Sequence, residues 1–225
     1  MITRLFNIAF VVFAVAMSSA SFAQQNQDFD VKPFSKFLIK TNFRIPFTTQ
    51  NNFLKEVADG VVDMQGSLNY AIIKKFYVGA GYRYAFFKLS DTKLNSDPRA
   101  QFDGQIVQQG IYGELSYFYD LYENFSIETN FQIGMENSIG SSAECESKTS
   151  SKGVFFAPNL NFYLKTDEVF SFFFSLGYNF SNTNFTPESV CKESFPNFNA
   201  TDYETNYQHF NVGFGIGISI SKPDN

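Results

Sequence analysis

Three kinds of side chain in this sequence could do chemistry: one histidine, two cysteines and a set of charged residues. His209 is the only histidine, so a Ser–His–acid triad or an Asp–His pair would have to be built around it. No Gly-x-Ser-x-Gly motif accompanies it, and no group of His, Cys and Asp residues has the spacing of a metal site. We therefore expect a histidine without a catalytic role, no bound metal and no cofactor. An enzyme built around His209 stays an alternative.

The first segment has the features of a secretory signal peptide. Arg4 precedes the apolar run Ile8–Met17, and Ser21–Ala23 resembles the site that a signal peptidase accepts. The run is shorter than the roughly 20 residues that a membrane-spanning helix needs. We expect residues 1–23 to be removed, with cleavage after Ala20 as the second choice. The mature chain would then be exported from the cytoplasm.

The two cysteines, Cys145 and Cys191, stand in different polar stretches of the chain. Two cysteines in an exported protein favour a disulfide, which would be structural and would join two links between strands. Two free thiols or a redox pair are the alternative, although no Cys-x-x-Cys motif supports the redox pair.

Composition narrows the class of protein. The chain has 225 residues, with 30 Phe, 12 Tyr and a formal charge of −5, and it has no basic run of the kind that binds nucleic acid. The length suits a single all-β domain. After the signal segment, no run of about 18 apolar residues predicts a membrane-spanning helix.

Period-two alternation recurs in segments of about ten residues, which is typical of barrel strands. In Phe125–Asn137, one face carries Phe125, Ile127 and Phe131, and the other carries polar residues such as Glu128 and Glu136. We expect eight such strands: Lys36–Phe47, Val61–Ile73, Tyr77–Leu89, Ile106–Tyr119, Phe125–Asn137, Val154–Lys165, Val169–Ser181 and His209–Ser221.

The links between these segments alternate in length. Short links are expected at Lys74–Phe76, Asp120–Asn124 and Thr166–Glu168, and long polar links at Thr48–Gly60, Ser90–Gln105, Ser138–Gly153 and Asn182–Gln208. In an up-and-down barrel, all the short links lie at one end and all the long links at the other. Short periplasmic turns and long outer loops are typical of bacterial outer-membrane barrels.

The distribution of charge favours a barrel with its polar face inside. The polar faces are rich in Gly and Ser, which suit a narrow lumen, and aromatic residues gather at the ends of the apolar faces. A soluble ligand-binding barrel with the opposite arrangement is the alternative. Charges of both signs stand on the polar faces, where we expect a buried ion network: Lys40, Arg44, Asp63, Arg83, Glu114, Glu128 and Glu136.

The last strand carries a more specific pattern, polar-x-Gly-x-x-apolar-x-apolar, at Asn211, Gly213, Ile216 and Ile218. With the eight alternating segments, it resembles the small eight-stranded outer-membrane proteins of Gram-negative bacteria, the OmpA/OmpX-like β-barrel group. The resemblance implies that this strand is an assembly signal for the barrel-assembly machinery, with periplasmic chaperones as further partners during biogenesis. The chain departs from that group by continuing past Ser221, where an aromatic residue often ends the chain.

The sequence therefore predicts an all-β, eight-stranded antiparallel up-and-down transmembrane barrel over residues 36–221, located in the cell outer membrane. A polar lead-in, residues 24–35, precedes the barrel, and a tail, residues 222–225, follows it. We expect a lumen plugged by side chains, four long outer loops, and a structural or interaction role in the envelope: integrity, adhesion or membership of a secretion or assembly complex. Outer-membrane lipid would surround it. A narrow channel or transporter for small solutes is the first alternative, and a membrane-embedded enzyme around His209 the next.

Overall fold

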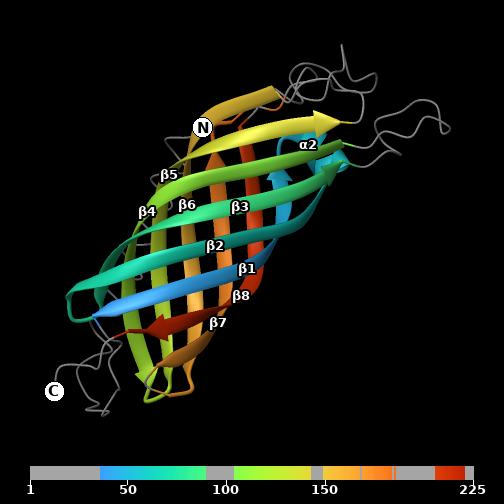
Figure 1. Cartoon of the computed structure of the whole chain (residues 1–225). Coiled ribbons are helices and arrows are strands. Elements are labelled where there is room, and N and C mark those ends of the chain that lie inside the picture. The colour runs from blue at the N-terminus through green and yellow to red at the C-terminus, as the bar shows by residue number, and fades with distance from the viewer. Residues whose placement is uncertain are drawn as a thin grey trace, which may run out of the picture.

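The structure is a computed structural model of the chain, and it describes residues 36–89, 104–142, 149–167, 169–183, 185 and 206–220. Eight strands and a short helix make up most of these residues (Figure 1). In chain order they are β1 (Phe37–Gln50), α2 (Asn52–Val57), β2 (Ala58–Ile73), β3 (Phe76–Leu89), β4 (Gly104–Tyr122), β5 (Phe125–Ser142), β6 (Thr149–Lys165), β7 (Phe170–Ser181) and β8 (Tyr207–Ser219). The strands agree in number and order with the prediction.

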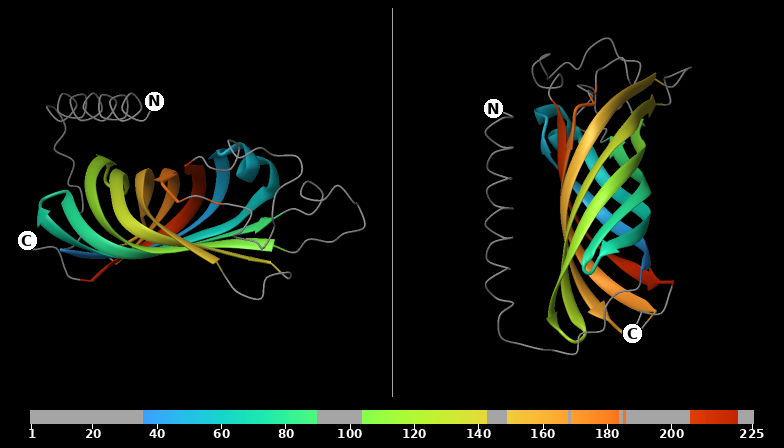
Figure 2. Two further views of the ribbon diagram at one scale, coloured as in Figure 1. Left: turned by 90° about the horizontal axis from the view of Figure 1, so that it is seen from above. Right: turned by 90° about the vertical axis from the view of Figure 1, so that its left-hand side faces the viewer.

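The strands form a closed barrel. Each strand pairs antiparallel with its neighbours in the chain, and β1 also pairs with β8. At this closing seam, Phe43 stands opposite Phe214, and Ile39 opposite Ile218. Closure matters in lipid because an open sheet edge would leave backbone N–H and C=O groups without partners. Figure 2 shows the strands tilted against the long axis, as closure requires. The predicted all-β, up-and-down barrel is confirmed.

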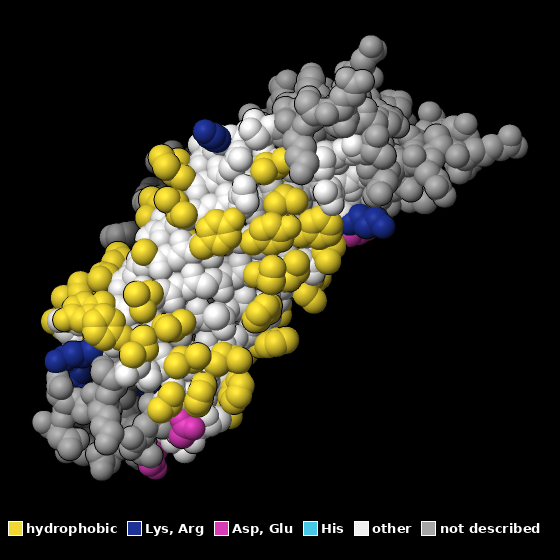
Figure 3. Space-filling view, viewed as in Figure 1, with side chains coloured by type: hydrophobic (Ala, Val, Ile, Leu, Met, Phe, Trp, Pro, Cys, Tyr) yellow, Lys and Arg dark blue, Asp and Glu magenta, His cyan; other side chains and the backbone are white. Residues whose placement is uncertain are grey.

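Apolar side chains point out of the barrel and polar side chains point into it. Ile133, Phe172 and Ile216 are exposed on the wall, whereas Glu128 and Asn211 are buried in the lumen. Figure 3 shows apolar side chains spread over the visible wall, with charged side chains near its two ends. A water-soluble barrel has the opposite distribution. The wall is therefore a lipid-facing surface, as the alternation predicted.

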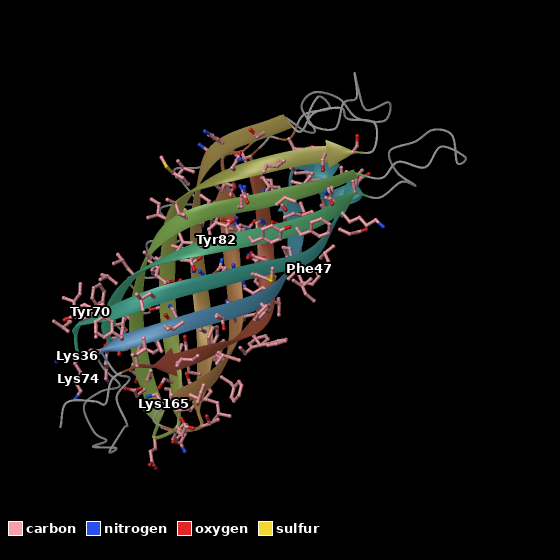
Figure 4. The ribbon with its side chains drawn as sticks, in the orientation of Figure 1. Lys36, Phe47, Tyr70, Lys74, Tyr82 and Lys165 are labelled. Atoms are coloured by element: carbon pink, nitrogen blue, oxygen red, sulfur yellow. The ribbon has the colours of Figure 1, made fainter. Side chains whose placement is uncertain are left out.

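The ends of the wall carry aromatic and basic side chains. Figure 4 shows Tyr70 beside Lys36 and Lys74 at one end, with Tyr82 and Phe47 farther along the barrel. The Tyr82 hydroxyl donates a hydrogen bond to the side chain of a neighbouring glutamine on the wall (3.1 Å). Such amphipathic side chains suit the boundary between hydrocarbon and water, so Tyr70 with Lys36 and Lys74 marks the edge of the lipid-facing band at that end.

The short links occur where they were expected. Lys74 and Lys75 form the turn between β2 and β3, with Lys75 at a φ of 72°. Residues 123–124 join β4 to β5, and residues 166–169 join β6 to β7. Because consecutive strands are antiparallel, these turns lie together at one end, called here the short-turn end. The opposite end is called the long-link end.

Two of the long links are shorter in the structure than the sequence predicted. Thr48–Gly60 is wrong as a polar loop, because β1 continues to Gln50, α2 follows, and β2 begins at Ala58. Ser138–Gly153 is too wide, because β5 runs on to Ser142 and β6 begins at Thr149. The physical reason is that strand pairing continues beyond the apolar band: Gly140 is still paired with Thr149. The alternation of apolar and polar residues stops where the outward-facing residues become polar, although the backbone hydrogen bonds between the strands continue.

Several predicted segments lie outside the described residues. These are the signal segment 1–23, the lead-in 24–35, the tail 222–225 and most of the links over residues 90–105 and 182–208. In the part of the chain that the structure describes, no helix is long and apolar enough to cross a bilayer.

Candidate functional site

All seven charged residues expected in the lumen are buried inside the barrel, and none is more than 6% exposed. They come from five consecutive strands, β1 to β5, because each stands on the inward face of its strand. The structure brings them into two ion clusters. The outer cluster contains Arg44, Asp63, Arg83 and Glu136, and the inner cluster contains Lys40, Glu114 and Glu128.

The outer cluster lies nearer the long-link end. Asp63 Oδ2 accepts hydrogen bonds from Arg44 Nη2 (3.0 Å) and Arg83 Nε (3.2 Å). Arg83 Nη1 donates to Glu136 Oε2 (3.1 Å), and Glu136 Oε1 also accepts from the Ser181 hydroxyl. Two guanidinium groups therefore face two carboxylates. Because an uncompensated buried charge is costly, each of these ions depends on the others for its stability.

His209 joins the outer cluster, although the sequence did not place it there. Its Nε2 lies 2.7 Å from Arg83 Nη2 and 3.8 Å from Asp63 Oδ2. A guanidinium only donates hydrogen bonds, so Nε2 is the acceptor and we assign the ring proton to Nδ1. The side chain is fully buried and contacts the rings of Phe87 and Tyr207. A general base must reach its substrate, and these contacts instead make His209 part of the packing.

The inner cluster lies nearer the short-turn end. Lys40 Nζ donates to Glu128 Oε1 (2.7 Å) and lies 3.2 Å from Glu114 Oε1. Glu128 Oε2 accepts from Asn161 Nδ2 (2.7 Å), and Glu114 Oε2 accepts from Asn130 Nδ2 (2.7 Å). Three of the four carboxylate oxygens thus accept hydrogen bonds from N–H donors, which stabilise the ionised form, whereas Glu114 Oε1 has the Lys40 ammonium nearby but accepts no hydrogen bond. Two anions share one buried cation.

A third ion cluster lies at the short-turn end and was missed in the sequence. Asp120 lies 3.3 Å from Lys75 Nζ and 3.2 Å from Lys165 Nζ, and it accepts a hydrogen bond from Ser126 (2.6 Å). The alternation of inward and outward residues along β4 and β6 would have placed Asp120 and Lys165 in the lumen. Asp120 continues the inward set of Glu114 on β4, and Lys165 continues the inward set of β6. Both residues were excluded because the predicted strand or its polar face stopped one step too early.

Three buried apolar clusters lie among the described residues of the barrel, and the smallest contains Tyr112, Phe155 and Ala157. At the long-link end, Leu54 and Val57 of α2 pack in a buried cluster with Phe87, Leu89 and Tyr207. Farther along, a second buried cluster separates the inner ion cluster from the third: Leu38, Tyr77, Phe118, Tyr163 and Phe173. Among the described residues, buried apolar side chains therefore occupy the lumen at each of these levels.

The remaining predicted site residues fall in two groups. Asn211 and Gly213 face the lumen on β8, and Ile216 and Ile218 face lipid. Their role as an assembly signal stays a prediction. Cys145 and Cys191 lie outside the described residues, so the disulfide also stays a prediction. Among the residues that are described, no group of three or more His, Cys, Asp or Glu is placed to hold a metal ion.

No protein family model matches this chain, and no curated protein matches it by sequence. Solved structures do resemble it. Neisserial surface protein A superposes with a TM-score of 0.55 at 10% identity, over 83% of this chain and 98% of that chain. OprG from Pseudomonas aeruginosa gives 0.47 at 11% identity (86% and 100%), and the attachment invasion locus protein Ail of Yersinia pestis gives 0.47 at 10% (81% and 97%). Identities this low concern the fold alone.

The fold is that of the small eight-stranded outer-membrane barrels. The apolar wall and the ionic lumen explain why such a barrel is stable in a membrane. The side chains that face outward tolerate hydrocarbon, and the charged side chains in the lumen are shielded from it. The protein is an integral protein of the outer membrane.

Proposed function

We propose that this protein is a membrane anchor with a closed lumen that holds its outer links at the cell surface. The observation that supports the proposal best is the pair of buried ion clusters, which join β1 to β5 across the lumen. A passing solute would have to separate these ions, and leaving one partner of a buried pair without its counter-ion costs about 3–5 kcal/mol. A barrel of eight strands is also about filled by its side chains.

The direction of insertion follows from the lengths of the links. In outer-membrane barrels, the short turns face the periplasm and the long loops face the exterior. The strand ends that flank residues 90–103 and 186–205 would therefore face the exterior. These two segments are polar and rich in Asn, Asp and Ser, which suits contact with water or another protein. The role we infer is in the envelope: integrity, adhesion or membership of a secretion or assembly complex.

Replacing an outer link tests this role. In the variant, residues 91–102 are exchanged for a short Gly/Ser linker, and the comparison is with the wild type and a deletion strain. We expect the variant to keep the heat-modifiable gel migration of a folded barrel and to show the detergent sensitivity or loss of adhesion of the deletion strain. A variant that folds and behaves as the wild type in every such assay would show that this link does not carry the function.

A narrow channel is the second candidate, and one observation favours it: the middle of the lumen contains a small polar cavity. Single-channel recording of the purified protein in planar bilayers distinguishes the two. A closed lumen predicts no steady conductance from the wild type. A steady conductance that changes in Glu128→Gln or Arg83→Gln would show that ions pass through the clusters, and the anchor proposal would then be wrong.

A further inference from the structure

A small chamber in the middle of the lumen is built from polar side chains. Its volume is about 10 Å³, close to the least space that holds one water-sized occupant. None of its lining residues is more than 8% exposed. Lys40 and Glu114 line it together with six carboxamide side chains: Asn42, Gln65, Asn130, Gln132, Asn159 and Asn161.

The charge around the chamber is unbalanced. Lys40 is the cation of the inner cluster, whereas Glu114 and Glu128 are both anions, which leaves a surplus of one negative charge. The outer cluster cannot supply the missing cation, because its two arginines already face two carboxylates. The third cluster has one positive charge in excess, but it lies at the short-turn end, beyond the second apolar cluster.

The hydrogen bonding around the chamber is unbalanced in the same direction. Asn42 Oδ1, Gln132 Oε1 and Asn161 Oδ1 have no donor within the protein, and against these three oxygens stands a single unpaired nitrogen, Gln65 Nε2. One water molecule donates two hydrogen bonds and would satisfy only two of the oxygens. A hard cation is ligated by several carboxylate and carboxamide oxygens at once.

We propose that this chamber binds a single alkali-metal cation such as Na⁺ or K⁺, ligated by the carboxamide oxygens of Asn42, Gln132 and Asn161 beside the carboxylate of Glu114. A monovalent ion balances the one surplus charge, whereas a divalent ion would leave a positive surplus beside Lys40. The cation is a structural ion that is trapped in the lumen. The proposal does not depend on the role of the outer links.

Thermal unfolding in different salts tests the proposal. The purified full chain in zwitterionic detergent is heated in NaCl, KCl, RbCl or choline chloride at equal ionic strength, and unfolding is followed by the heat-modifiable gel shift. Choline is too large for the chamber. An alkali salt at ten times the dissociation constant should raise the unfolding midpoint above the choline value by about 3 °C.

A matched pair of variants shows whether the effect arises in the chamber. Asn42→Ala removes a proposed ligand, whereas Asn179→Ala removes another buried asparagine whose Oδ1 also has no donor, but which lies beside His209. We expect the difference between alkali and choline salts to disappear in Asn42→Ala and to persist in Asn179→Ala. Equal midpoints in all salts for the wild type, or the same response in both variants, would overturn the site.

A direct observation covers the case in which Asn42→Ala does not fold. Wild-type crystals grown in RbCl should give an anomalous difference peak among Asn42, Gln132 and Asn161. Absence of that peak would show that the chamber holds water. Conductance in planar bilayers remains a separate measurement, so a failure of the closed-lumen proposal is distinguishable from a failure of the cation site.

Discussion

Arg83 is the residue on which the outer ion cluster depends most. Its guanidinium contacts Asp63 and Glu136 at 3.1–3.2 Å and His209 at 2.7 Å, and its carbon Cζ lies 5.4 Å from the ring centre of Phe155. Because all of these groups are buried, no solvent can replace a lost contact. A single side chain thus connects four strands besides its own.

Arg83→Gln should therefore destabilise the barrel by about 3–5 kcal/mol, because it leaves one carboxylate of the outer cluster without a counter-ion. The measurement is urea-induced unfolding in lipid vesicles. Lys88→Gln is the control, since Lys88 stands on the same strand but is exposed, and its effect should stay within about 0.5 kcal/mol. Equal effects of the two substitutions would show that the cluster does not stabilise the barrel.

Two glycines make a second comparison of single residues. A Cβ at Gly215 would collide with the ring of Phe173 and the carbonyl oxygen of Thr41, whereas a Cβ at Gly66 meets no atom within 4 Å. We expect Gly215→Ala to cost about 1–3 kcal/mol through overpacking. Gly66→Ala should leave stability unchanged or raise it slightly. Unfolding midpoints in the same vesicles test this, and a neutral Gly215→Ala would mean that the lumen has room to rearrange.

At this scale, the sequence predicts which residues face the lumen but not which of them pair. Period two fixes the face of a residue, so Arg44 and Asp63 could be placed inside together. Pairing depends on the stagger between strands, which a single sequence does not contain. His209 was missed as a partner of Arg83 because β8 and β3 face each other across the lumen and are not neighbours in the sheet.

Among the elements, α2 departs most from the expectation. It begins after Asn51, whose φ is 78° and whose Oδ1 accepts a hydrogen bond from Leu54 N (3.0 Å). The helix has only six residues, too few for a 3.6-residue period to emerge from a polar stretch. Tertiary packing explains why it forms, since Leu54 and Val57 are buried over the long-link end of the lumen.

Asn51→Ala should loosen α2 without unfolding the barrel. It removes the capping acceptor, which costs about 1 kcal/mol. It also holds an alanine at a positive φ, which alanine adopts less readily than glycine or asparagine. Hydrogen exchange of the amides in residues 54–58 should become faster, while the global unfolding midpoint stays the same. Asn51→Gly keeps the backbone freedom and loses only the cap, so its exchange should be intermediate. Unchanged exchange in Asn51→Ala would show that packing alone holds the helix.

The two cysteines belong to different outer links, and their pairing remains a prediction. Peptide mapping under non-reducing conditions should find the peptides of Cys145 and Cys191 joined, and reduction should separate them. In the chain-entropy model a bridge that closes a loop of this size stabilises by about 4 kcal/mol. Recovery of both cysteines as free thiols from freshly isolated outer membranes would contradict the bridge.

For the whole molecule, the interior is a stack of apolar and ionic layers along the barrel axis. The inward residues of β4 show the order: Ile106 in the first apolar cluster, Glu114 beside the chamber, Phe118 in the second apolar cluster and Asp120 in the third ion cluster. The class of fold was predictable because the same inside-out alternation occurs in all eight strands. The order of the layers was not predictable, because it depends on the stagger between strands that are distant in sequence.

The lipid-facing wall makes the last prediction, which concerns the molecule as a membrane protein. Ile133 lies near the middle of β5 and is 62% exposed, whereas Ile73 ends β2 at the short-turn end and is 67% exposed. In a bilayer, Ile133→Lys should cost about 2–4 kcal/mol because the charge lies in hydrocarbon, and Ile73→Lys about 0–1 kcal/mol because it lies near the interface. In water, two side chains of such similar exposure would respond alike. Urea unfolding in phospholipid vesicles measures the difference, and equal small costs at both positions would mean that this wall is not embedded in lipid.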